Sequence, residues 1–144
     1  MNEKSLRRIA ANYELLAHRM GDLTRSFYGH LFQRMPQVRP LFRLDMDVQS
    51  QHLAAALGLI VRNLRDLDVL EEPLMELGAG HAQAGVRPEH YPVLCRTMVQ
   101  TLRDGSGTAW SSDLEADWTE LLERISQIMM TGALRHTISS LRST

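Results

Sequence analysis

Three polar side chains of the sequence fall at positions where the helical pattern requires apolar ones. His81 lies in the stretch LGAGHAQAG and continues the three- and four-residue spacing of the leucines before it. Tyr28 and Gln49 lie in two other segments, each on the inward side of its expected helix. An imidazole lone pair can bind a metal, and a phenol or an amide can hydrogen-bond a small ligand held opposite it.

His81 has two interpretations on the residues alone. An unpartnered buried imidazole costs about 1–3 kcal/mol, and the carbonyl of Leu77, one turn earlier, can satisfy only one of its two nitrogens. In the first interpretation His81 is a core histidine held by that carbonyl. In the second, its free lone pair binds a metal. No Glu, Asp, Cys or second His shares the stripe, so a zinc or iron site built from several side chains is disfavoured, whereas a cofactor such as haem needs only one axial histidine.

Composition narrows the class of protein. The 144 residues suffice for one core, so we expect a single domain over residues 1–144. The net charge of -1 comes from scattered charges, which argues against nucleic acid or an anionic membrane as partner. The single Cys95 excludes an internal disulfide, and no C-x-x-C-H stretch exists for covalent haem attachment. Without an apolar run for a signal peptide or membrane span, we expect a cytoplasmic protein.

The elements that must position these side chains are helices. Apolar residues recur at helical spacing along the chain, and no segment alternates as a half-buried strand does, which predicts an all-α protein. A first helix is expected to end at Gly21, and Asp22 to open a second that stops at Pro36. Further helices are expected over residues 53–67, 70–84 and 88–102, and from Ser112 onward.

Several stretches occur together in an informative order: FYGHLFQRMPQVRPLF (27–42), ALGLIVRNLRDL (56–67), GHAQAGVRPEHYPVL (80–94) and Trp118. Over the span from Phe27 to Trp118 the chain resembles the bacterial single-domain globins and the haem domain of flavohaemoglobins. The resemblance implies a globin fold of about six to seven helices around a haem pocket, without the short fourth helix of myoglobin. It also implies a non-covalent haem b as cofactor.

On the distal side of that pocket, the resemblance gives Tyr28 the role of hydrogen-bond donor to bound oxygen. Phe42 matches the ring packed on the haem, and Leu53 the apolar residue over the iron. The segment after Phe42 is three residues shorter than in these globins, so counting without a gap puts His52 at the distal glutamine position. Alignment on residues 56–67 puts Gln49 there, and we favour Gln49 because helix geometry is regular; His52 then lies toward the pocket mouth, near a haem propionate.

On the proximal side, His81 matches the residue that ligates the haem iron. Tyr91 matches a tyrosine close to that histidine, and Leu77 and Val86 are expected to line the pocket beside it. Flavohaemoglobins carry a glutamate in the last helix that acts through this tyrosine and histidine, but here that position is Ala133. Because such partners tune the basicity of the ligating histidine, its loss argues against fast oxidative turnover.

The function implied by the resemblance is reversible binding of oxygen, and of nitric oxide or carbon monoxide, at a ferrous haem, for oxygen delivery or scavenging. A nitric oxide dioxygenase is the enzymatic alternative, and it would need an external reductase because 144 residues leave no room for flavin and nicotinamide domains. A haem-based gas sensor and a haem-free interaction module are further alternatives. A homodimer contact is expected on the exposed side of the last helix, at Met129 and Met130.

Overall fold

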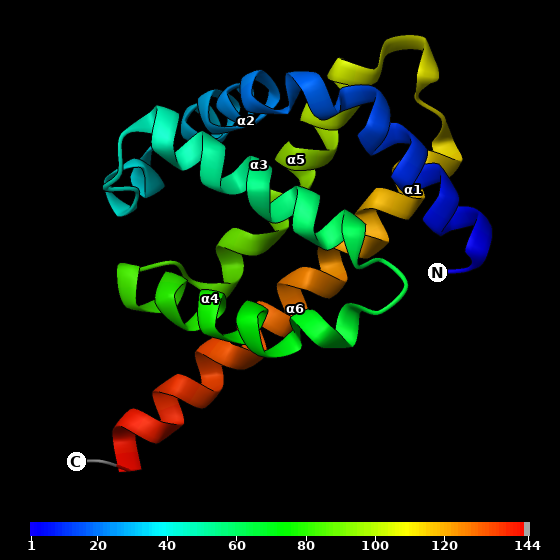
Figure 1. Ribbon diagram of the computed structural model, residues 1–144. Coiled ribbons are helices and arrows are strands. Elements are labelled where there is room, and N and C mark those ends of the chain that lie inside the picture. Colours follow the sequence, from blue (N-terminus) through cyan, green and yellow to red (C-terminus); the bar gives the residue numbers. More distant parts are fainter. Residues whose placement is uncertain (143–144) are drawn as a thin grey trace.

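Six α-helices joined by short 3₁₀ turns make up residues 1–142, which the computed structural model describes (Figure 1). Residues 143 and 144 of the expected domain lie outside this range. The helices are α1 (Glu3–Leu16), α2 (Met20–Arg34), α3 (Met46–Arg62), α4 (Glu71–Ala84), α5 (Tyr91–Ser106) and α6 (Ser112–Arg142). The 3₁₀ turns cover Ala17–Arg19, Pro36–Leu41, Leu67–Leu70, Pro88–His90 and Gly107–Ala109. The described part of the chain contains no strand, so the all-α prediction is confirmed.

Local signals explain where some of the helices begin or end. The Asn2 side chain accepts a hydrogen bond from the Ser5 N–H and opens α1, and Asp45 caps α3 in the same way through the Asp47 N–H. Gly85 ends α4 with φ of 109°, a left-handed conformation that favours glycine. Residues 42–45 lead directly into α3 without a helix, as expected for a fold that lacks the short fourth helix.

The boundary between the first two helices differs from the prediction. The chain turns at Ala17–Arg19, and both Gly21 and Asp22 lie in the first turn of α2. A glycine ends a helix by adopting the left-handed conformation, and Gly21 does not adopt it, since only Gly85 and Gly107 have a positive φ among the described residues. Leu16 and Met20, on either side of the turn, are both buried in the core.

Two glycines allow the backbones of α4 and α6 to come into direct contact. A Cβ atom on Gly78 would overlap the carbonyl group of Met129, and one on Gly132 would overlap that of Met75. The two backbones therefore touch where the helices cross, as Figure 1 shows for the lower part of α6. This crossing determines the position of His81, which lies three residues after Gly78 on the same helix.

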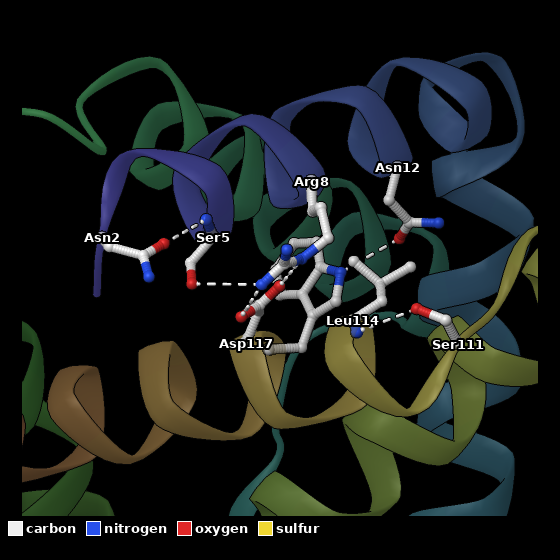
Figure 2. Close-up of polar contacts among 8 residues, drawn as sticks. Asn2, Ser5, Arg8, Asn12, Ser111, Leu114 and Asp117 are labelled. Atoms are coloured by element: carbon white, nitrogen blue, oxygen red, sulfur yellow. Dashed lines mark hydrogen bonds and ion pairs between the residues drawn. The ribbon is translucent and has the colours of Figure 1, made fainter.

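The first half of α6 is attached to α1 by polar contacts (Figure 2). The Arg8 guanidinium donates from Nε and Nη2 to the two carboxylate oxygens of Asp117, at 2.6 and 3.1 Å. The buried Trp118 donates from its indole nitrogen to Asn12 Oδ1 at 3.0 Å, and the Asn12 amide donates to Ser106 Oγ at 2.9 Å. Each buried polar group in this network therefore has a partner.

The two methionines in the second half of α6 are less exposed than the expected dimer contact requires. Met129 is only 8 % exposed because it packs at the crossing with α4, and Met130 is partly buried. The exposed methionine pair expected as a dimer contact is therefore absent. The exposed apolar residues of this helix include Leu134 and Ile138, at 62 % and 42 %. No helix among residues 1–142 has both the length and the apolar character needed to cross a membrane.

Candidate functional site

A largely apolar cavity of about 350 Å³ lies between α3 and α4 and is closed from behind by α2, α5 and α6. This volume is within the usual range for sites that hold small molecules or cofactors. Its lining includes Leu53, Ala56, Leu57, Leu59 and Ile60 of α3, and Pro73, Leu74, Leu77 and His81 of α4. Both helices turn apolar side chains toward this space, which is therefore suited to an apolar group.

The cavity opens to the surface between these two helices. Leu59 of α3 and Leu77 of α4 line it and are 44 % and 42 % exposed. An apolar ligand seated in the cavity would take part of both side chains out of water, which is favourable. They therefore mark the mouth through which a large apolar ligand can enter.

His81 contributes the only imidazole to the described lining of this cavity. Its Nδ1 lies 2.8 Å from the Leu77 carbonyl oxygen, and because a carbonyl can only accept, Nδ1 carries the proton and donates. Burial lowers the pKa of His81, and the hydrogen bond to Leu77 opposes this shift without reversing it. The ring is thus neutral near pH 7 and keeps the Nε2 lone pair available for a metal ion.

No cluster of metal-binding side chains surrounds His81 in the part of the chain that the structure describes. Residues 1–142 contain no group of three or more His, Cys, Asp or Glu side chains arranged to hold a metal ion. The described chain therefore has no site for a metal bound by protein side chains alone. A metal at His81 would have to arrive in a cofactor that supplies its other ligands.

Tyr28 reaches the cavity from α2 and is paired with Gln49 of α3. The Gln49 amide Nε2 donates to the Tyr28 hydroxyl oxygen at 3.1 Å, and Tyr28 is 5 % exposed. Because Tyr28 accepts this bond, its own O–H proton is left to donate to a third group. Burial raises the pKa of Tyr28 more than the Gln49 bond lowers it, so the hydroxyl stays protonated at neutral pH.

Aromatic rings hold Tyr28 in place. The Phe42 ring meets it edge to face with centroids 5.4 Å apart, Phe27 does so at 5.1 Å, and Phe32 stacks at 5.9 Å. The Arg39 guanidinium lies over Phe32 at 5.1 Å. Such contacts restrict the phenol ring, which therefore presents its hydroxyl in one direction.

The other residues singled out from the sequence are placed as follows. Phe42, Leu53, Leu77, Val86 and Tyr91 all line the cavity. Gln49 is not in the lining and reaches it through its bond to Tyr28. His52 is exposed on α3 and does not line the cavity, so of the two alternatives for the distal position only Gln49 contacts Tyr28.

Behind His81 the polar groups are Tyr91, Cys95 and Ser126. Tyr91 is 5 % exposed, and no residue among 1–142 makes a hydrogen bond to its hydroxyl. Cys95 Sγ and Ser126 Oγ lie 3.2 Å apart across α5 and α6. The sequence alone did not place Cys95 or Ser126 at the site, although Cys95 follows Tyr91 by one helical turn and Ser126 follows Ile125, which is buried.

Comparison with known proteins agrees with this architecture. The Globin family model matches residues 25–129, which is more than half of the chain. The chain belongs to the globin family. The resemblance inferred from the sequence, and the expected globin fold, are thereby confirmed.

Both a sequence relative and a solved structure resemble this globin over most of its length. A flavohemoprotein of Rhizobium meliloti is 24 % identical over 132 residues, which cover 90 % of this chain and 33 % of that protein. The globin thus spans about a third of that relative. A globin of Campylobacter jejuni superposes with a TM-score of 0.82 at 20 % identity, covering 93 % of this chain and 97 % of the other.

An engineered carbene transferase derived from a proposed nitric oxide dioxygenase of Rhodothermus marinus superposes with a TM-score of 0.87 at 22 % identity. This match covers 100 % of this chain and 99 % of the other. At such identities both structural likenesses establish the fold and leave the activity to the residues of the pocket.

Proposed function

We propose that residues 1–142 form one globin domain that holds a haem between α3 and α4, with His81 Nε2 as its protein ligand, and binds diatomic gases, oxygen foremost. The observation that carries the proposal is the His81 hydrogen bond to Leu77, which fixes the neutral tautomer and leaves Nε2 free. Membership of the globin family implies haem binding. The apolar walls and the leucines at the cavity mouth suit a flat, mostly apolar cofactor.

A haem held here would supply an iron centre that binds diatomic gases; the protein decides how tightly. We propose haem b, held without a covalent bond, since Cys95 is the sole cysteine and no C-x-x-C-H stretch occurs. Phe42, Leu53 and Val86 would pack against the cofactor, because each already lines the cavity.

Tyr28 would donate its free O–H to an oxygen molecule in the pocket, and Gln49 would orient the phenol that donates. A hydrogen bond to a ligand that carries partial negative charge contributes about 1–3 kcal/mol in a buried site. Oxygen would consequently leave slowly. Carbon monoxide, which carries less charge, would gain less from the same donor.

The test is the visible spectrum of the purified protein when oxidised, when reduced, and when reduced under carbon monoxide. We expect a Soret band that shifts on reduction and again with carbon monoxide. His81→Ala should lose or alter this band, whereas His52→Ala, a change at an exposed histidine outside the cavity, should leave it as in the wild type. A protein without a Soret band even after addition of haemin would contradict the proposal and favour a haem-free interaction module.

A nitric oxide dioxygenase is the second candidate, favoured by the Tyr28–Gln49 pair and by the flavohemoprotein relatives. The globin domain spans about a third of the Rhizobium meliloti relative, and the reducing equivalents would have to come from a reductase outside residues 1–142. Ala133 offers no carboxylate behind Tyr91, so we expect slow turnover. Stoichiometric loss of nitric oxide from the reduced, oxygenated protein, renewed when a flavin reductase and NADH are added, would support this activity. Its absence would leave gas binding alone.

A further inference from the structure

A second hollow lies on the outside of the molecule, between α5 and α6. It is an open groove of about 870 Å³, and polar side chains such as Arg96, Gln100, Glu123 and Gln127 contribute to its lining. The groove faces water, whereas the inner cavity is apolar. The two hollows therefore lie on opposite sides of the wall made by α5 and α6.

That wall is one side chain thick where the two hollows meet. Tyr91, Cys95 and Ser126 line both the groove and the inner cavity. Cys95 and Ser126 have small side chains, and the contact between them is a thiol–hydroxyl pair 3.2 Å apart. Elsewhere the back of the cavity is formed by larger side chains, including Met98 and Met129. Because Ser126 Oγ donates its proton to the Leu122 carbonyl at 2.9 Å, the two side chains are joined only by the Cys95 thiol, which is a weak donor.

Tyr91 adds a polar group at the same point. It is 5 % exposed, and no residue among 1–142 hydrogen-bonds its hydroxyl. The hydroxyl oxygen itself is not enclosed by protein atoms, so a small molecule that comes within reach, such as water, can satisfy it. The wall therefore combines a weak contact with a free donor that can hold a small polar or polarisable molecule for a short time.

We propose that the Cys95–Ser126 contact is a second entrance, through which small neutral molecules pass between the α5/α6 groove and the part of the inner cavity that lies behind His81, beside Tyr91. The inference rests on the proposed gas-binding function. The apolar lining of the cavity penalises charged species, so the route admits diatomic gases and water and rejects anions. The mouth between Leu59 and Leu77 remains the route for the cofactor.

Flash photolysis of the carbon monoxide adduct tests this route. Ser126→Phe fills the wall and should slow bimolecular recombination several-fold while raising the fraction that recombines before leaving the protein. Thr119→Phe is the matched control, because Thr119 lies on α6 and lines the groove without lining the cavity. The control should recombine at the wild-type rate.

Cys95 permits the same test without a core mutation. As the sole cysteine, it can be converted in the folded wild-type protein to a benzyl or a methyl disulfide by the corresponding methanethiosulfonate. The benzyl adduct should slow recombination more than the methyl adduct, and Cys95→Ala, which thins the wall, should accelerate it.

The outcomes separate the two proposals. Recombination unchanged in Ser126→Phe and in the benzyl adduct, with a normal carbon monoxide spectrum, would overturn the second entrance and leave the haem function standing. Equal slowing in Ser126→Phe and Thr119→Phe would also overturn it, since the effect would then belong to the groove. A protein that forms no carbon monoxide adduct would overturn the proposed function and this entrance with it.

Discussion

Gln49 and Tyr28 are 21 residues apart in the chain, and the amide of the first donates a 3.1 Å hydrogen bond to the hydroxyl of the second at the edge of the cavity. The direction of this bond matters because a hydroxyl that accepts from a protein donor retains its own proton for another acceptor. The pair therefore works as one unit, in which Tyr28 presents the proton and Gln49 positions it.

Removal of the phenol hydroxyl should release oxygen faster. Tyr28→Phe keeps the ring and its contacts with Phe27 and Phe42, and loses about 1–3 kcal/mol of hydrogen bonding, which corresponds to a roughly five- to 150-fold faster dissociation. Gln49→Leu should have a smaller effect, and the double variant should resemble Tyr28→Phe because the two residues act together. Stopped-flow displacement of oxygen measures the rate. An unchanged rate in Tyr28→Phe would remove Tyr28 from the distal site.

The glycine at the helix crossing should not tolerate a methyl group. Gly78→Ala forces a Cβ into the Met129 carbonyl, so α4 and α6 must separate, and we expect a loss of about 1–3 kcal/mol of unfolding free energy and weaker haem retention at His81. Gly80→Ala on the same helix is the control, since nothing lies within 4 Å of its Cβ position and alanine favours helix by up to about 1 kcal/mol. Urea denaturation of both variants provides the comparison. Equal stabilities would mean that the two helices do not touch at Gly78.

Acid should weaken the link between α1 and α6. The hydrogen bonds from Arg8, aided by its charge, hold the pKa of Asp117 below its usual value although burial opposes the shift. Because the folded-state pKa is lowered, the stabilisation is complete above the unfolded value of about 3.9 and is lost as the pH falls through the folded value.

Asp117→Asn should therefore be less stable than the wild type at about pH 7, and the difference should shrink as the pH is lowered toward about 3. Denaturation by urea at several pH values is the appropriate measurement. Asp104→Asn, a change at an exposed carboxylate of α5 away from Arg8, is the control and should keep the wild-type stability difference between these pH values. A constant difference between Asp117→Asn and wild type at all pH values would show that the ion pair does not titrate as proposed.

The Phe42 ring should matter for holding the cofactor. Phe42 lines the cavity and contacts both Tyr28 and Phe32, whereas Phe32 contacts Tyr28 without lining the cavity. We expect Phe42→Leu to speed transfer of haem to an excess of an acceptor apoprotein, because contact area is lost. Phe32→Leu should leave the transfer rate close to that of the wild type. Identical rates in both variants would indicate that neither ring touches the haem.

Much of the fold follows from signals that act within a few residues. The caps at Asn2 and Asp45 and the left-handed Gly85 determine where helices begin or end, and the apolar spacing determines which face turns inward. The His81–Leu77 bond is of this kind, since it joins residues one turn apart on a single helix. The imidazole tautomer is thus implied once the helix is recognised.

Whether Gln49 or His52 lies beside Tyr28 depended on how the helices pack. Gln49 and His52 lie on the same helix, only about 60° apart around its axis, so local spacing could not choose between them. The choice depends on how α3 rotates against α2, where Thr24 Oγ1 donates to the Ser50 carbonyl at 3.0 Å and Gln49 meets Tyr28. His52 is then left on the exposed side.

The sequence by itself therefore determined the all-helical class, the inward-facing histidine and the family, because these depend on periodicity and residue order. Tertiary structure alone decided that Met129 is buried at the Gly78 crossing and that Cys95 of α5 meets Ser126 of α6. Those contacts join residues far apart in the chain, and they depend on the angle and rotation at which two helices pack. No local pattern encodes that angle, since the same apolar stripe can pack in several ways.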